Sequence, residues 1–270
     1  MIIDFHTHVF PEVIAAKTIE KLGAFANITA KTNGVLSDLK ASMQEAGVDY
    51  SVILPVVTKP AQFQSVNEYA ASINGKDGII SFGGIHPDST DYKRELDQIH
   101  AFGLPGIKLH PDYQQVHIND RRYLDLITYA VDLGLIISIH AGVDIGLPDI
   151  VHCPPNEALQ MLQYVEEHAK HPEEAKIILA HTGGYDQWDD VEQLLVGKHV
   201  YFDLAYSLGH IPDQQLLRII ENHGADRILF ATDSPWSGQK EDIAYLKSLG
   251  LPPEEESAIL GENGAVLLQL

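Results

Sequence analysis

The strongest constraint in this sequence is an alternation of short apolar runs with segments of helical period. Eight runs rich in β-branched residues are candidate strands, at residues 2–5, 50–55, 79–85, 106–110, 135–140, 176–181, 200–204 and 227–232. Such alternation is typical of βα units with a parallel sheet. A closed barrel and an open doubly wound sheet both fit. The count of eight, and the lack of a glycine-rich dinucleotide loop after the first run, favour a (β/α)8 barrel of the α/β class.

Helix-period segments fill most of the intervals, and they commonly end at a glycine that relieves left-handed strain. We expect helices at 35–46, 66–74, 92–102, 121–133, 155–168, 188–196, 212–222 and 241–249, with a helical tail at 253–260 and 264–268. Barrels of this kind take about 250 residues as one unit, so residues 1–270 are expected to form a single domain. Specificity would then lie in the loops at 11–34, 56–64, 111–119, 142–155 and 206–211.

Charge and composition limit the partners. The 270 residues carry 38 acidic and 18 basic side chains, a formal net charge of −20, which argues against nucleic acid or an anionic membrane as a partner. No apolar run approaches the roughly 18 residues of a membrane span. A polar cluster stands where a signal peptide would begin, and there is one cysteine. A cytoplasmic protein with a small-molecule substrate is the expectation.

Titratable residues gather where the candidate strands end. They are His6 and His8 after the first run, His140 after the fifth, His181 after the sixth and Asp233 after the eighth. In a barrel all these ends meet at one rim, and strand alternation turns His6 and His8 to the same side. With 14 histidines and a single cysteine, a metal site here must use imidazole and carboxylate. Such a set suits zinc or another first-row divalent ion.

A structural explanation exists for each residue taken alone. A lone histidine at a strand end is more often a packing or surface residue than a ligand, and Asp-Ser-Pro is commonly a turn. Four of the eight runs, however, carry a suitable ligand at the same end. The set as a whole therefore indicates a metal site.

Four stretches of the chain carry a family resemblance. They are Asp-Phe-His-Thr-His at 4–8, Gly-Ile-Lys-Leu-His-Pro at 106–111, Leu-Ala-His-Thr-Gly-Gly at 179–184 and Ala-Thr-Asp-Ser-Pro at 231–235. Together they resemble the amidohydrolase superfamily, and most closely its amidohydrolase-related group (amidohydrolase 2), which includes the aminocarboxymuconate-semialdehyde decarboxylase type. The likeness extends from residue 2 to about residue 263.

The resemblance implies a (β/α)8 barrel with a catalytic metal at its C-terminal rim. It implies that His6, His8, His140 and Asp233 bind a zinc-like ion with a water molecule. His181 would contact that water or the substrate, or complete a second metal site, as in binuclear relatives. One ion is favoured over two.

Lys108 has three interpretations. In binuclear relatives a carbamylated lysine at this place bridges two metals. A free Lys108 ammonium could instead hold a substrate carboxylate, or the side chain could simply pack at the strand end beside an acid. We favour the uncarbamylated form.

Further residues are weaker candidates for substrate contacts. His110, on the same face as Lys108, and His86 and Trp236 are expected at the pocket, with Tyr113, Trp188 and Tyr206 as further wall candidates. His86 could equally cap a turn, and plain packing explains the four aromatic residues at least as well. The histidines at 117, 168, 171, 199, 210 and 223 are expected at the surface, and Cys153 is not expected to be a nucleophile.

The leading functional hypothesis is hydrolysis. A metal-bound hydroxide would attack the carbonyl-type carbon of an amide, a lactone or a related compound, with Asp233 moving the proton and the metal or His181 holding the oxyanion. The alternative is a metal-dependent decarboxylase or hydratase acting on a small carboxylic acid. The carboxylate of this substrate would bind Lys108, or an arginine from a neighbouring subunit if the chain forms a homo-oligomer.

Two further hypotheses rank lower. A deoxyribonuclease of the TatD type would be expected to have a glutamate where Lys108 stands, and the net charge of −20 disfavours a phosphate polymer. A catalytically inactive barrel used as a scaffold would not need a complete set of metal ligands.

Overall fold

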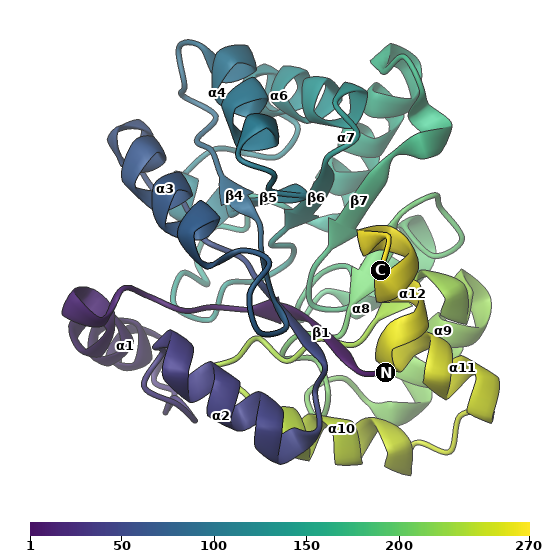
Figure 1. The fold of residues 1–270 in the computed structure, drawn as a ribbon. Coiled ribbons are helices and arrows are strands. Elements are labelled where there is room, and N and C mark those ends of the chain that lie inside the picture. Colours follow the sequence, from purple (N-terminus) through teal and green to yellow (C-terminus); the bar gives the residue numbers. More distant parts are fainter.

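The computed structural model describes all 270 residues and has eight parallel strand positions, one for each apolar run. Helices surround these strands in Figure 1. The third position is interrupted at Phe82 and counts as two short strands. The strands are β1 (Ile3–Thr7), β2 (Tyr50–Ile53), β3 (Ile79–Ser81) with β4 (Gly83–Gly84), β5 (Gly106–Leu109), β6 (Ile136–Ile139), β7 (Lys176–Leu179), β8 (Tyr201–Asp203) and β9 (Ile228–Leu229).

Backbone hydrogen bonds close the strands into a ring. β1, β2 and β3 pair in that order, and β4 to β9 pair in sequence order. The Phe82 amide donates to the Ile53 carbonyl at 2.9 Å and so joins the two sets. On the other side the Phe5 amide donates to the Phe230 carbonyl, and the Asp233 amide to the His6 carbonyl, each at 2.9 Å. This closure confirms the predicted (β/α)8 barrel.

The helices follow the predicted order with shifted ends. The helices that correspond to predicted segments are α2 (Leu36–Ala46), α3 (Phe63–Ile73), α4 (Tyr92–Ala101), α6 (Arg121–Asp132), α7 (Pro155–His168), α8 (Trp188–Leu194), α9 (Asp213–His223) and α10 (Gln239–Ser248). The tail forms α11 (Pro253–Ser257), a π-helical turn η4 (Ala258–Glu262) and α12 (Asn263–Leu268). Single 3-10 turns lie at η1 (Pro60–Gln62), η2 (Pro172–Glu174) and η3 (Ala225–Arg227).

Two of the predicted loops contain helices instead. The 11–34 segment holds α1 (Glu12–Ala26), and the 111–119 segment begins with the short α5 (Pro111–Gln114). α1 buries only Ala15 and Gly23, so it lacks the apolar stripe at helical spacing by which the other helices are recognised. The prediction of a loop at 11–34 was therefore wrong.

The core has two layers. A cluster of 50 buried residues fills the space between the strands and the outer helices, and a cluster of 13 lies mainly inside the barrel. Ala265 and Leu267 of α12 belong to the inner cluster, and both chain termini lie beside α12 in Figure 1. None of the helices combines the length and the apolar character that crossing a membrane requires.

Candidate metal centre at the carboxyl ends of the strands

A cavity of about 1010 Å³ opens at the carboxyl ends of the strands. Its lining includes every predicted ligand, namely His6, His8, His140, His181 and Asp233, and also Lys108, His110, Tyr113, Tyr206 and Trp236. His86 and Trp188 do not line it. The Nδ1 atom of His86 instead accepts a hydrogen bond from the Asp88 amide at 3.1 Å, and the Trp188 indole donates to the His181 carbonyl at 3.1 Å.

An irregularity in β1 turns its histidines into the cavity. The pairing register of β1 with β2 shifts between Asp4 and Thr7. Phe5 belongs to the inner core, yet the adjacent His6 lines the cavity as His8 does. A bulge redirects side chains in this way and is frequent next to functional sites.

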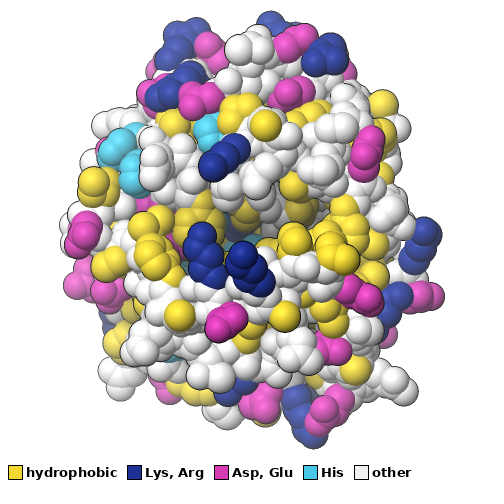
Figure 2. All heavy atoms as spheres, turned by 90° about the vertical axis from the view of Figure 1, so that its left-hand side faces the viewer, with side chains coloured by type: hydrophobic (Ala, Val, Ile, Leu, Met, Phe, Trp, Pro, Cys, Tyr) yellow, Lys and Arg dark blue, Asp and Glu magenta, His cyan; other side chains and the backbone are white.

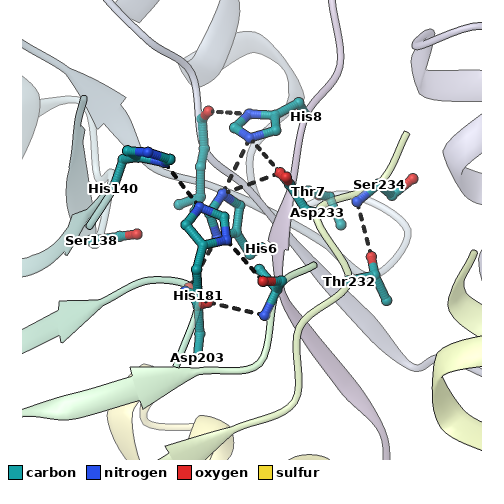
Figure 3. A network of polar contacts seen from close by, with 12 residues as sticks. His6, Thr7, His8, Ser138, His140, His181, Asp203, Thr232, Asp233 and Ser234 are labelled. Carbon is teal, nitrogen blue, oxygen red and sulfur yellow. Dashed lines mark hydrogen bonds and ion pairs between the residues drawn. The ribbon is translucent and has the colours of Figure 1, made fainter. Parts of the chain in front are cut away.

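His6, His8 and Asp233 form the tightest group of candidate ligands, with one ligand atom from each lying within 4.8 Å of the others. Nε2 of His6 is 3.2 Å from Nε2 of His8. Oδ1 of Asp233 is 3.1 Å from Nε2 of His8 and 3.5 Å from Nε2 of His6. Figure 3 shows the three side chains converging. Since zinc binds imidazole nitrogen at about 2.0–2.1 Å, two nitrogens about 3 Å apart are suitably spaced to share one ion.

The outer nitrogens of these histidines have hydrogen-bond acceptors. Nδ1 of His6 faces Oδ2 of Asp203 at 3.0 Å, and Nδ1 of His8 faces the Leu54 carbonyl at 2.8 Å. An acceptor at Nδ1 places the proton there and leaves Nε2 with a lone pair. With its proton on Nδ1, His8 faces Oδ1 of Asp233 at 3.1 Å with a nitrogen that has no proton to donate, and a cation between these acceptors would satisfy both. The donor set therefore fits a divalent metal ion.

His140 and His181 lie beside this group as a pair. Nδ1 of His181 donates to the Ala205 carbonyl at 2.8 Å, and its Nε2 is 2.9 Å from Nδ1 of His140. Nε2 of His140 has no hydrogen-bond partner and lies 3.7 Å from Oδ2 of Asp112, which is also buried and unpartnered. The structure thus brings His140 next to His181, while His6, His8 and Asp233 form the closer group.

Burial and neighbouring charges set the protonation states. Burial lowers the pKa of His6 and of His140 well below its usual value, and the charges of Lys108 and of other histidines lower it further. Burial acts to raise the pKa of Asp233, but its contact with His8 and the other neighbouring imidazoles outweigh burial and lower that pKa. Neutral imidazoles and an ionised carboxylate are the forms that bind metal.

Lys108 lies at the floor of the cavity and is 1% exposed. Its Nζ is 3.2 Å from Nε2 of His6 and 3.5 Å from Oγ of Ser138. No ion pair joins it to a carboxylate. Burial lowers the pKa of Lys108 to about 8, against the opposing effect of Asp203 and Asp233. This cation therefore has no anionic partner of its own at the cavity floor.

A second group of candidate ligands consists of His110, His140 and Asp144, also within 4.8 Å of one another. Nδ1 of His110 accepts from the Tyr113 amide at 3.4 Å, which leaves Nε2 as the donor toward Oδ2 of Asp144 at 3.5 Å. The His110 ring also stacks on His140 with 4.1 Å between centroids. Because this pairing has a donor and an acceptor, it needs no second ion.

Three supporting residues were missed by the sequence reasoning. Asp203 ends β8 and also accepts from the His181 and Ala205 amides. It stands at a strand end, so the rule that found the histidines could have found it too. Asp112 and Gln114 lie in α5, and Gln114 bonds the Val57 and Ile85 carbonyls at 2.8 and 2.7 Å. No sequence signal marks these two.

Two other predictions concern residues that do not line the cavity. His223 was expected at the surface, and this was wrong, because it is 1% exposed. Its ring fills a space against Phe202, with the centroids 4.1 Å apart. Cys153 is fully buried, and burial raises the pKa of its thiol well above the usual value, which makes it a poor nucleophile.

Comparison with known proteins shows the family. A sequence profile described as amidohydrolase matches residues 3–270, whereas no curated protein gave a significant sequence match.

Several solved structures share the fold. An uncharacterised TIM-barrel protein from Bordetella bronchiseptica is 19% identical, with a TM-score of 0.78 over 99% of this chain and 98% of that one. The 5-carboxyvanillate decarboxylase of Sphingomonas paucimobilis is 14% identical, with a TM-score of 0.70 over 100% and 99%. A dihydroxybenzoic acid decarboxylase from a Polaromonas species, solved with bound manganese, is 14% identical, with a TM-score of 0.73 over 100% and 97%. With a family profile that covers almost its whole length, the chain belongs to the amidohydrolase family.

Proposed function

We propose that this enzyme is a metal-dependent lyase that removes a carboxylate group from a small carboxylic acid. His6, His8 and Asp233 would hold one divalent first-row ion, zinc or manganese, and His140 would complete its ligands from the end of β6. The observation that carries the choice of a carboxylic acid is Lys108, a buried ammonium group with no carboxylate partner.

The environment of Lys108 supports an anionic substrate. A buried charge that no carboxylate contacts is costly. The Lys108 Nζ has hydrogen-bonding contacts only with a neutral imidazole and a hydroxyl, and Asp203 and Asp233 act on it without an ion pair. A substrate carboxylate at the cavity floor would supply the missing charge. A neutral amide or lactone would leave it uncompensated. Solved decarboxylases that share the barrel are consistent with this choice.

The side chains have distinct roles in this proposal. A bound divalent ion supplies Lewis acidity that orients an oxygen of the substrate. Lys108 holds the carboxylate until the carbon–carbon bond breaks. The bonding electrons stay on the carbon, a proton is added there, and carbon dioxide leaves. Nε2 of His110, which faces Asp144 and carries a proton, is a donor within the cavity.

Hydrolysis, the leading hypothesis from the sequence, is the second candidate, and Asp233 is the observation that favours it. Its carboxylate is kept ionised by the surrounding histidines, and its side chain remains 15% exposed toward the cavity. Such a group could take a proton from a water molecule that attacks a carbonyl carbon. His181 would then stabilise the oxyanion.

One experiment separates the two candidates. The metal-loaded enzyme is incubated with hydroxybenzoic acids labelled at the carboxyl carbon and, separately, with aryl lactones and amides. We expect labelled carbon dioxide from an acid, and a loss of more than about a hundredfold in rate for Lys108→Met. The exposed Lys198→Met serves as the control and should retain the rate. Hydrolysis of a lactone or amide without carbon dioxide from any acid, or full decarboxylation by Lys108→Met, would overturn the proposal.

A further inference from the structure

One face of α1 forms part of the outer wall of the cavity. Ile14, Lys17, Lys21 and Phe25 all line it, and their spacing of three or four residues places them in one stripe along the helix. α1 lies at the left of Figure 1, so its side of the molecule faces the viewer in Figure 2. A hollow opens on that face, with Lys or Arg side chains beside it among apolar ones.

The two lysines of this stripe have no acidic partner. Both are exposed, and neither takes part in any of the ion pairs of the structure, whereas Lys40, Lys170 and Lys240 each pair with a carboxylate. The carboxylates that line the cavity are Asp112, Asp144 and Asp233. Each of these lies within 4 Å of a histidine that also lines the cavity.

The charge of the outer wall is therefore opposite to that of the whole chain. With a net charge of −20, a random stretch of surface would contain more acids than bases. Here two cations face the cavity, and no glutamate lines it. The exposed apolar side chains of the same helix, Ile14 at 49% and Phe25 at 54%, add a surface for the uncharged body of a ligand.

We propose that Lys17 and Lys21 bind a carboxylate at the outer end of the substrate, away from the end that reacts. The substrate class would be a small dicarboxylate with an aromatic or other apolar body. Lys108 would take the carboxylate at the floor and α1 the one at the mouth. This inference rests on the proposed function, which makes the cavity the substrate site and places the reacting carboxylate at Lys108.

The test compares two ligands of nearly the same shape. Isophthalate carries two carboxylates, and 3-carbamoylbenzoate replaces one of them with a neutral amide. Dissociation constants are measured by calorimetry on the protein as purified, in low salt. We expect isophthalate to bind about tenfold more tightly, and expect the double variant Lys17→Gln, Lys21→Gln to reduce this preference to less than about twofold.

Lys247→Gln, in the exposed last turn of α10, is the matched control and should keep the preference. Equal affinities for the two ligands, no saturable binding of either, or an unchanged preference in the double variant would each overturn the inference. Metal content, measured on the same samples, reports on the proposed function separately, because the substituted lysines are not among the candidate ligands. Circular dichroism verifies that the variants are folded.

Discussion

The histidines of two regions of this barrel show how differently the same side chain can be used. At the carboxyl ends of the strands, His6 and His8 turn their inner nitrogens toward each other, 3.2 Å apart. Near the start of β8, His223 accepts from the Gly197 amide at Nδ1 (3.0 Å) and faces the Val200 carbonyl with Nε2 (2.9 Å). One neutral tautomer satisfies both nitrogens of His223. His8, in contrast, faces an acceptor with each nitrogen, the Leu54 carbonyl at 2.8 Å and the Asp233 carboxylate at 3.1 Å. No neutral tautomer satisfies both, which is why we assign this group to a cation.

The largest expected effect concerns the carboxylate that completes the first group. Asp233→Asn removes the negative charge that balances the ion. We expect affinity for zinc or manganese to fall by more than about a hundredfold, because losing even a supporting residue commonly costs 10- to 100-fold. Chelator competition measures the dissociation constant. Affinity near that of the wild type would exclude Asp233 as a ligand.

His223 belongs to the other region of the comparison, and its burial is expected to make the stability of the protein depend on pH. Burial lowers the pKa of His223 to about 4, below the value of about 6.5 expected in an unfolded chain. Between these values the unfolded chain binds a proton that the folded chain excludes. The unfolding free energy should therefore fall by up to about 3 kcal/mol as the pH drops from about 6.5 to 4, as measured by urea titrations.

Substitution of His223 tests whether this residue causes the loss of stability. His223→Gln should flatten the pH dependence over that interval, and His199→Gln, at an exposed position, should leave it unchanged. The same slope in the His223→Gln protein would show that other groups are responsible.

A smaller effect is expected from the residue that holds His6. Asp203→Asn replaces the carboxylate that accepts from Nδ1 of His6 at 3.0 Å with a neutral amide. The His6 proton is then held less firmly on Nδ1, and the ring is less well oriented. We expect metal affinity to decrease about 10- to 100-fold, with Asp226→Asn at the exposed position of η3 as the control. An unchanged dissociation constant would mean that the Asp203 contact only supports packing.

The smallest effect on metal affinity is expected for Asp112, which lies beside His140 as Asp203 lies beside His6. The contact of His140 with Asp112 is 3.7 Å long and is not a hydrogen bond in this structure. Asp112→Asn should therefore lower metal affinity by less than about tenfold, the lower limit for a supporting residue. A larger loss than that of Asp203→Asn would reverse the order of importance proposed here.

The sequence predicted the barrel well because its signals are local. Continuous apolar runs such as that at 135–140 identify buried strands without knowledge of their neighbours. The convergence of His6, His140 and Asp233 followed from one general property of parallel barrels, that the carboxyl ends of the strands share a rim.

The errors have physical reasons as well. α1 was missed because its apolar residues face the cavity and solvent and are not buried against the barrel. The role of Asp112 depends on a short helix whose position the pattern does not encode. The burial of His223 depends on contacts with Phe202 and with the backbone before β8, which only the folded chain brings together.

The most direct test of the metal assignment is anomalous X-ray scattering from crystals grown with zinc or manganese, recorded at the absorption edge of the metal. We predict one peak per chain, in contact with Nε2 of His6, Nε2 of His8 and the Asp233 carboxylate. A peak only between His110 and Asp144, or no peak in crystals of metal-saturated protein, would contradict the proposal that the first group of histidines binds the catalytic ion.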